Sequence, residues 1–75
     1  MKREPVESSS IVSIGYDPTW KMLEIEFTES GEVYIYFDVP QVEYEAFMSA
    51  PSKGTYLNQQ FKKAGYRFER VDTTK

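Results

Sequence analysis

Residues 33–37, Val33-Tyr34-Ile35-Tyr36-Phe37, alternate between apolar side chains and tyrosines. Such β-branched and aromatic residues favour a strand, in which successive side chains point to opposite faces of the sheet. The alternation predicts that Val33, Ile35 and Phe37 face the interior, and that Tyr34 and Tyr36 stand together on the other face. A pair of outward tyrosine rings is suited to stacking on nucleic-acid bases, and equally to a dimer interface.

Two earlier segments, 11–16 and 20–27, alternate in the same way and predict antiparallel strands that precede this one. A three-residue loop, 29–31, with Gly31 in the left-handed conformation, would join the second strand to the third. The register that follows puts the apolar residues on one face. The predicted opposing pairs are Phe27 with Val33, Ile25 with Ile35, Leu23 with Phe37, Ile14 with Leu23 and Val12 with Ile25.

Two helices are predicted after the strands. Pro40 is typical of a helix start, because its missing N–H has no partner to lose in the first turn, and this helix extends to Ala50. Pro51 ends it. The second helix extends to about Ala64, and Gly65 is a natural terminator.

The predicted fold class is therefore α+β: a three-stranded antiparallel meander followed by two helices packed on one face of the sheet (β-β-β-α-α). Residues 66–70 alternate again and could add a short C-terminal strand or an ordered tail. We expect residues 1–10 to be a flexible N-terminal arm, 11–70 a single domain and 71–75 a frayed tail. The predicted core comprises Val12, Ile14, Leu23, Ile25, Phe27, Val33, Ile35, Phe37, Phe47, Leu57 and Phe61.

Composition limits the class of protein. The chain has 75 residues, 40% of them hydrophobic, with no cysteine, so one domain must be held together by packing, and association with a second copy is a reasonable expectation. No apolar stretch approaches the ~20 residues of a membrane-spanning helix, and no signal peptide is recognisable at the start. We expect a cytoplasmic protein with no membrane association.

Charge divides along the chain, although the net charge is only −3. Residues 4–45 hold ten acids and one base, whereas residues 46–75 hold six bases and two acids. The two halves would therefore present opposite potentials wherever the fold keeps them apart. The favoured interpretation is a solvated acidic sheet and a solvated basic tail.

A set of residues occurs in a recognisable order along the chain: Val6, Ser8-Ser9, Ile11, Gly15-Tyr16-Asp17, Leu23-Glu24-Ile25, Phe27, Gly31, Tyr34-Ile35-Tyr36, Val39-Pro40, Tyr44, Phe47, Ala50, Ser52, Gly54, Tyr56-Leu57-Asn58 and Tyr66. This order resembles the KTSC domain, a short module found alone in bacterial proteins and at the carboxyl end of some lysyl-tRNA synthetases. The resemblance covers nearly the whole chain, and it implies a small α+β domain. The family has no established biochemical activity, and RNA binding is suggested only by the synthetases that carry the domain. The acids around the tyrosine pair depart from a simple RNA-binding surface, because carboxylates repel phosphates.

A nucleic-acid surface is the first candidate site, with the tyrosines as stacking residues and the basic second half as phosphate contacts. The alternative for the tyrosines is a pair that shields the sheet or meets a second copy. The alternative for the lysines is a helix C-terminus supplied with cations. The candidate residues are Tyr34, Tyr36, Lys62, Lys63, Arg67 and Arg70.

A small-ligand site is the second candidate, at Ser52, Tyr56 and Asn58 near the start of the second helix. The alternative, which the pattern favours, is that Ser52 or Thr55 only caps the helix and that Asn58 holds the neighbouring loop. No residue pattern indicates a metal or another cofactor.

Catalysis is not expected, because the chain has neither histidine nor cysteine, which removes the commonest general base and the strongest nucleophile. The sequence thus predicts a small non-enzymatic interaction module that self-associates and binds RNA or DNA through the candidate surface. The alternative is a module for protein–protein association alone, and a third hypothesis is an enzyme or small-ligand site near Asn58.

Overall fold

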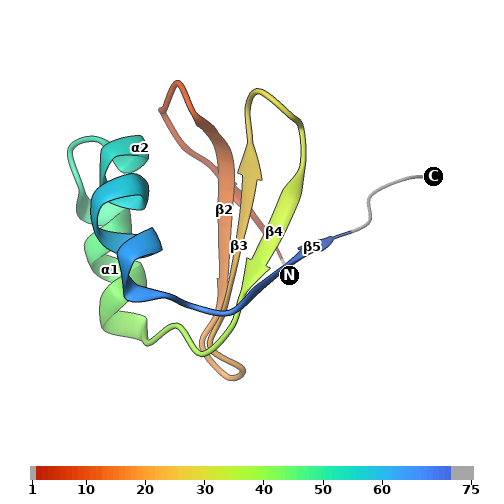
Figure 1. The fold of residues 1–75 in the computed structure, drawn as a ribbon, viewed down its shortest axis with the longest axis vertical. Coiled ribbons are helices and arrows are strands. Elements are labelled where there is room, and N and C mark those ends of the chain that lie inside the picture. Colours follow the sequence, from red (N-terminus) through yellow and green to blue (C-terminus); the bar gives the residue numbers. More distant parts are fainter. Residues whose placement is uncertain (1, 72–75) are drawn as a thin grey trace.

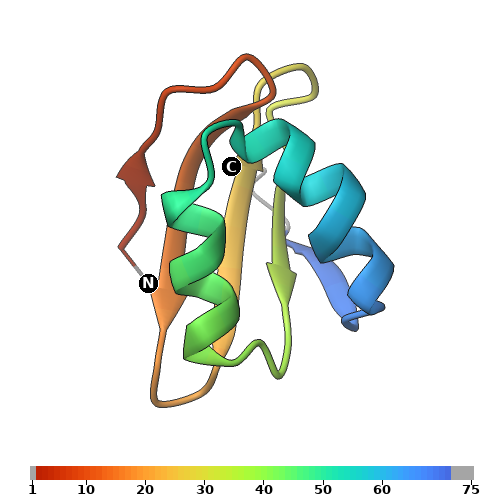
Figure 2. The ribbon, with the colours of Figure 1, turned by 90° about the vertical axis from the view of Figure 1, so that its left-hand side faces the viewer.

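The computed structural model describes residues 2–71 and has one antiparallel sheet with helices over one face (Figures 1 and 2). The sheet has five strands in the order β1-β2-β3-β4-β5. The predicted α+β class, the central meander, the two helices and the added C-terminal strand are present, and β1 is a further strand that the sequence did not predict. The bounds are β1 Glu4–Pro5, β2 Ile11–Asp17, β3 Met22–Phe27, β4 Val33–Tyr36, α1 Gln41–Ser49, α2 Lys53–Tyr56, η1 Leu57–Phe61, η2 Lys62–Ala64 and β5 Phe68–Val71.

Local signals determine where the helices begin and end. Pro40 precedes α1, and the Ser52 hydroxyl accepts a hydrogen bond from the backbone N–H of Thr55 at the start of α2. The segment α2–η2 is one helical run that passes through a π-helical turn and a 3₁₀ turn. Gly65 ends it with a φ of 77°, which is the left-handed conformation expected of a glycine there.

The register between β3 and β4 differs from the predicted one by one residue. The Phe27 N–H donates to the Glu32 carbonyl (2.9 Å) and the Gly31 N–H donates to the Phe27 carbonyl (3.0 Å), so the loop holds four residues, 28–31, instead of three. A shift of one residue turns every side chain of β4 to the other face. The observed opposing pairs are Leu23 with Tyr36, Glu24 with Ile35, Ile25 with Tyr34 and Glu26 with Val33.

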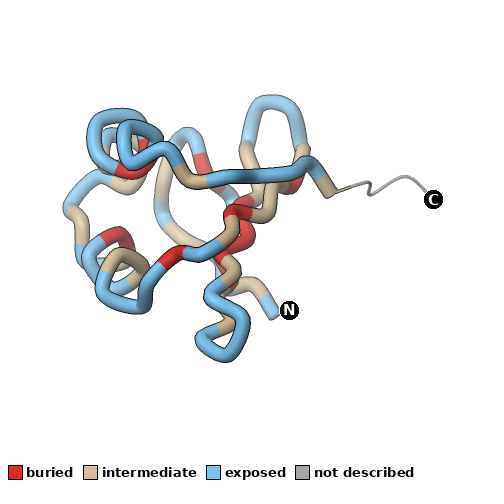
Figure 3. Tube along the Cα trace, turned by 60° about the horizontal axis from the view of Figure 1, so that its bottom comes forward, coloured by how far each residue is buried: buried red, intermediate tan, exposed pale blue. Residues whose placement is uncertain are grey.

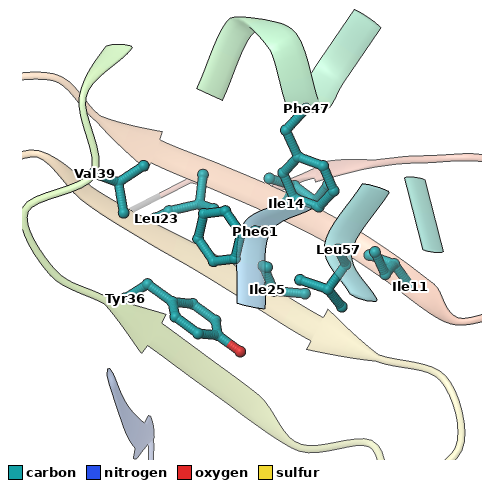
Figure 4. Packing of buried hydrophobic residues seen from close by; sticks show 9 residues of the cluster. All are labelled: Ile11, Ile14, Leu23, Ile25, Tyr36, Val39, Phe47, Leu57 and Phe61. Carbon is teal, nitrogen blue, oxygen red and sulfur yellow. The ribbon is translucent and has the colours of Figure 1, made fainter. Parts of the chain in front are cut away.

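The two tyrosines of β4 therefore lie on the helix side of the sheet, and the prediction that they face outward was wrong. Tyr36 is only 6% exposed, and its ring meets the Phe61 ring edge-on at a centroid distance of 4.8 Å (Figure 4). Tyr34 is half-buried, and Ile35 points to the opposite face. Tyrosine can occupy either side of a strand because its ring is apolar and its hydroxyl is polar, so alternation alone did not decide the face.

The register between β2 and β3 also differs, because a β-bulge lies between Ile11 and Ser13. Ile14 pairs with Ile25 instead of Leu23, and Val12 lies at the irregularity with 40% of its surface exposed. Val12 was thus wrongly assigned to the core. The core cluster comprises Ile11, Ile14, Leu23, Ile25, Tyr36, Val39, Phe47, Leu57 and Phe61 (Figure 4).

The outer face of the sheet is partly covered by the N-terminal segment that the sequence predicted to be a loose arm. Arg3 contacts Glu24 (3.1 Å) and Glu26 (3.7 Å), and its Nε donates to the Ser13 hydroxyl (3.0 Å). Gly15 permits this crossing, because a Cβ there would lie 2.7 Å from the Lys2 carbonyl oxygen. The mixed polar and apolar outer face is stable because the arginine satisfies its carboxylates.

Buried residues follow the interior side of β2–β4 and the facing turns of the helices, whereas β5 is mostly exposed (Figure 3). Val33 is buried but lies on the outer face, opposite Glu26. Val71 closes β5, and residues 72–75 of the predicted frayed tail lie outside the described residues. The exposed strand β5 thus forms one edge of the sheet, beside the tyrosines of β4.

Candidate functional site

A groove of about 840 Å³ lies between the helical run α2–η2, the β3–β4 hairpin and the strands β4 and β5. The helical run crosses the β4–β5 side of the sheet diagonally in Figure 2, and the groove lies beneath it. The lining residues come from five separate parts of the chain. They are Ser9, Ser10, Phe27, Glu29, Ser30, Glu32, Tyr34, Tyr36, Gly54, Leu57, Asn58, Phe61, Lys62, Tyr66 and Phe68.

Aromatic rings form one side of this groove. The Tyr34 ring lies 5.7 Å from the Phe27 ring and 5.6 Å from the Phe68 ring, between centroids. Tyr66 extends the row from the helical side, 4.9 Å from the Phe61 ring. Phe68 is 53% exposed, and Tyr34 and Tyr66 are half-buried, so these three rings can be reached from solvent.

Charged groups lie at the rim. A Glu32 carboxylate oxygen lies 2.8 Å from the Arg70 guanidinium, and its other oxygen accepts a hydrogen bond from the Tyr34 hydroxyl (3.2 Å). Lys62 lines the opposite wall, from η2. Glu29 adds a second carboxylate on the hairpin. The rim is thus acidic on the hairpin side and basic on the helical side, with one arginine held between the hairpin and β5.

The structure brings together part of the predicted nucleic-acid surface. Tyr34, Tyr36 and Lys62 line the groove, and Arg70 pairs with Tyr34 in the β4–β5 register, so that their side chains share a face. Tyr36 lies at the bottom, where its ring is buried, and cannot act as an exposed stacking residue. Burial also raises its pKa above that of an ordinary tyrosine.

Of the four predicted cations, only Lys62 lines the groove, and Arg67 and Lys63 also lie away from the Tyr34–Arg70 pair. The Arg67 guanidinium sits 4.7 Å from the centroid of the Phe37 ring, in a cation–π contact, and the Arg67 carbonyl accepts a hydrogen bond from the Phe37 N–H (2.8 Å). Lys63 is exposed near the end of the helical run. The predicted basic stripe is therefore divided, and Arg67 holds the turn before β5.

The residues of the predicted small-ligand site have partners within the fold. Ser52 caps α2, as the alternative reading expected, and the Tyr56 hydroxyl donates to the Glu43 carboxylate at 2.6 Å. That hydrogen bond, with burial and the charge of Glu43, raises the pKa of Tyr56 to about 12. The Tyr66 hydroxyl donates to the same carboxylate (3.2 Å), and burial together with Glu43 raises the pKa of Tyr66. Asn58 lines the groove.

A smaller hollow of about 270 Å³ adjoins the start of α2, opposite the serines of the N-terminal segment. Gly54 allows the two segments to approach closely, since a Cβ there would lie 3.2 Å from the Ser10 hydroxyl oxygen. The Ser8 hydroxyl accepts hydrogen bonds from the N–H groups of Ser10 and Ile11. These hydrogen bonds shape the N-terminal segment itself, beside the start of α2.

Sequence reasoning missed Phe68 and Glu32 as site residues. Phe68 belongs to the alternating segment 66–70, and it pairs with Tyr36 across β4 and β5. Glu32 was recognised only as an acid near the tyrosines. Pairing of residues 66–70 with the third predicted strand would have indicated Phe68, whereas no sequence signal placed Glu32 against Arg70.

Within residues 2–71, no cluster of three or more acidic side chains could hold a metal ion. None of the helices in this part of the chain has the length and apolar character that a bilayer crossing requires.

Proteins of known structure and sequence share this fold or are similar in sequence. The structure is similar to the crystal structure of a KTSC domain protein from Yersinia pestis, with a TM-score of 0.87 and 44% sequence identity. The similarity covers 95% of this chain and 97% of that chain. An uncharacterized protein of Stutzerimonas stutzeri is 46% identical over 72 residues, which is 96% of this chain and all of the relative.

A third relative is a larger protein. A lysine–tRNA ligase of Nostoc sp. is 40% identical over 65 residues, which is 87% of this chain but only 11% of the ligase. The sequence model of the KTSC domain family matches residues 7–68. Within the described residues, this range includes the helices and the strands β2, β3 and β4 in full, and it ends at the first residue of β5. The chain therefore belongs to the KTSC domain family.

Proposed function

We propose that this domain is a non-enzymatic binding module whose groove takes a short single-stranded segment of RNA. The observation that carries the proposal is the row of accessible rings, Tyr34, Tyr66 and Phe68, with Lys62 on the facing wall and Arg70 beside Tyr34. Aromatic side chains stack on any base, and cations next to them bind the backbone phosphates. A chain with neither histidine nor cysteine has few groups for catalysis, which supports binding without chemistry.

The size of the groove suits one or two nucleotides. Small-ligand pockets measure about 300–1,000 Å³, and this groove measures about 840 Å³. The neighbouring strand β5 is mostly exposed, so we expect a strand of RNA to pass along the groove without ending there. Stacking on an aromatic ring stabilises binding by about 1–3 kcal/mol per base. We therefore expect the rings to supply most of the affinity.

The choice of RNA is supported by the relatives. The matching region of the Nostoc protein is part of a lysine–tRNA ligase, an enzyme named for its tRNA substrate. A domain carried in such an enzyme would be exposed to single-stranded RNA segments. We expect no binding of a double helix at the rings, because stacking on them requires bases that are not already stacked in a duplex.

The acidic rim limits the electrostatic contribution. Glu29 and Glu32 repel phosphates, and the net charge is −3, so attraction comes from the two cations at the groove. For single strands, the logarithm of the binding constant falls by about 0.7 per logarithmic unit of salt for each phosphate neutralised. With Lys62 and Arg70 each neutralising one phosphate, we expect a slope of about −1.4.

The direct test is a fluorescence-anisotropy titration of a labelled hexauridylate RNA with the wild type and two variants. Phe68→Ala removes the exposed ring of the groove and should weaken binding about tenfold, which is the lower part of the range for one stacked base. Trp20→Ala is the matched control, because Trp20 is 70% exposed but belongs to the turn after β2 and does not line the groove. Equal effects of the two variants, or no binding of the wild type at low salt, would refute the proposal.

Association with a protein is the second candidate, favoured by the position of β5. This strand is an exposed edge of the sheet, and such an edge can pair with an extended segment of a partner or of a second copy. Sedimentation equilibrium distinguishes the version that involves a second copy. A dimer that dissociates in Phe68→Glu would support self-association, and a monomer at all concentrations would exclude it.

A further inference from the structure

Strand β5 ends one side of the sheet, and its outer edge has no neighbouring strand among residues 2–71 (Figure 2). Successive residues of an antiparallel strand direct their backbone groups alternately to one side and the other. The Arg67 carbonyl accepts the hydrogen bond of the Phe37 N–H, so the backbone groups of Arg67 and Glu69 point towards β4. The N–H and C=O of Phe68 therefore point outward, where an added strand would pair with them.

The side chains along this edge are exposed and carry opposite charges. Phe68 is 53% exposed and lies on the groove face. Glu69 lies on the outer face, opposite Ile35, and Arg67 shares that face two residues earlier. Within residues 2–71, the exposed Glu69 side chain has no hydrogen bond or ion pair. The Arg67 guanidinium stacks on the Phe37 ring, which leaves the N–H donors at the edges of its plane for a carboxylate.

We infer that β5 pairs antiparallel with β5 of a second copy of this chain, about a two-fold axis at Phe68, so that the two sheets become continuous. The inference rests on the second candidate function, association, and names its partner and its register; it does not require RNA. Charge complementarity supports a second copy as the occupant, because each strand carries both the cation and the anion that the pairing brings together.

Symmetry and charge decide the register. A two-fold axis perpendicular to the sheet places one residue opposite its own counterpart, and directly opposed residues share a face. With Arg67, Glu69 or Arg70 on the axis, two like charges would face each other, which is destabilising. Among residues 67–70, only Phe68 avoids this repulsion.

The register centred on Phe68 also creates two ion pairs. Arg67 of each copy lies opposite Glu69 of the other copy, on the outer face. These opposed residues are not hydrogen-bonded to each other through their backbones, so their Cα atoms approach to about 4.5 Å and their side chains lie close together. The two Phe68 residues exchange backbone hydrogen bonds, and their rings meet on the groove face.

The pairing would join the two grooves. The Phe68 ring lies 5.6 Å from the Tyr34 ring, and Phe68 of the second copy would extend this row on the same face of the sheet. Because the strands are antiparallel, the two chains enter β5 from opposite ends, which separates their η2 turns. A longer single strand could then contact the rings of both copies.

Sedimentation equilibrium of charge-reversal variants tests the register without RNA. We expect a monomer–dimer equilibrium for the wild type. Arg67→Glu and Glu69→Arg each put like charges opposite one another at two symmetric positions, and each should raise the dimer dissociation constant about tenfold. The double variant Arg67→Glu/Glu69→Arg restores the attraction and should bring the constant to within about threefold of the wild type. Lys63→Glu is the matched control, because it reverses a charge outside β5 and should leave the constant nearly unchanged.

Cysteine cross-linking locates the axis, in a chain that has no cysteine of its own. Phe68→Cys puts two thiols opposite each other at a Cα separation of about 5.5 Å, which a disulfide can span. Glu69→Cys puts them diagonally across the pair, beyond the reach of a disulfide without backbone movement. Phe68→Cys should therefore cross-link faster under mild oxidation.

A wild type that stays monomeric at every concentration would overturn the inference together with the self-association candidate, and would leave the edge to an extended segment of another protein. The RNA proposal would be unaffected, because the anisotropy titration tests it separately. A dimer that the double variant does not restore, or that cross-links faster in Glu69→Cys, would refute this register while self-association stands.

Discussion

The two faces of the sheet each carry an arginine–glutamate pair, and the pairs differ in their contact with water. On the outer face, Arg3 meets a Glu24 side chain that is only 10% exposed, within a network that includes Glu26 and Ser13. On the groove side, Arg70 meets Glu32, and both remain well exposed. A buried carboxylate that loses its partner strongly destabilises the fold, whereas an ion pair that water reaches contributes little to stability.

The largest difference in stability between the two faces should be seen on substitution of the neighbouring residues Ile35 and Tyr36. Tyr36 lies in the core and Ile35 on the outer face, half-buried. Tyr36→Ala should lower the free energy of unfolding by about 3 kcal/mol, the lower end for a large buried ring. Ile35→Ala should cost about 1–2 kcal/mol, because less surface is lost. Urea unfolding curves measure both values, and a costlier Ile35→Ala would contradict the register.

Arg3→Ala tests the outer pair. It leaves the buried Glu24 carboxylate without its ion-pair partner, which costs 3–5 kcal/mol at a fully buried site. Because Arg3 itself is about one-third exposed, we expect roughly 2 kcal/mol in urea unfolding. Lys2→Ala removes the neighbouring charge, at an exposed position, and should change stability by less than about 0.5 kcal/mol. Equal changes in the free energy of unfolding for the two variants would show that Arg3 contributes only its positive charge, without a specific ion pair to Glu24.

Tyr56 provides a pH test on the helix side. Its pKa is raised to about 12 by Glu43, so between about pH 10 and pH 12 the folded state keeps a proton that the unfolded state loses. The stabilisation is present below pH 10 and falls as the pH rises through that window. Tyr56→Phe should cost about 1 kcal/mol at neutral pH and show a shallower fall in alkali. The pKa of Tyr66 is also raised, so the free energy of unfolding of Tyr56→Phe should still fall somewhat as the pH rises in this range.

The smallest effect on stability should come from the groove pair. Arg70→Gln removes an exposed ion pair and should change the free energy of unfolding by less than about 1 kcal/mol. The same variant should weaken hexauridylate binding severalfold and reduce its salt slope by about 0.7. The contrast with Arg3→Ala, which alters stability and leaves binding intact, would establish the division between the two faces. A loss of stability in Arg70→Gln as large as that in Arg3→Ala would contradict this division between the two faces.

Local signals made the elements of this fold predictable. Pro40, Ser52 and Gly65 fix the helix ends through the chemistry of a few backbone groups, and the alternation of residues 66–70 indicated β5. Register was not predictable in the same way, because one extra residue in the loop before β4 reverses its faces. The wrong register was preferred because it placed all the apolar residues on one face. That choice did not consider Arg3, which pairs with the carboxylates of the outer face and so makes this mixed face stable.

The site was predictable only in part, for a related reason. Tyr34, Lys62 and Asn58 were identified as candidates from residue type, and all three line the groove. The contact between Glu32 and Arg70 joins positions 38 residues apart, and it depends on β5 lying beside β4. Without the register and the strand order, a sequence cannot indicate which acid and which base meet.

Chemical-shift mapping of the labelled wild-type protein with hexauridylate at low salt tests the central claim most directly. We expect the amide shifts to concentrate on Tyr34, Lys62, Phe68 and Arg70, around the groove, with none near Arg3 on the outer face. An absence of shifts, or shifts confined to the outer face, would contradict the account.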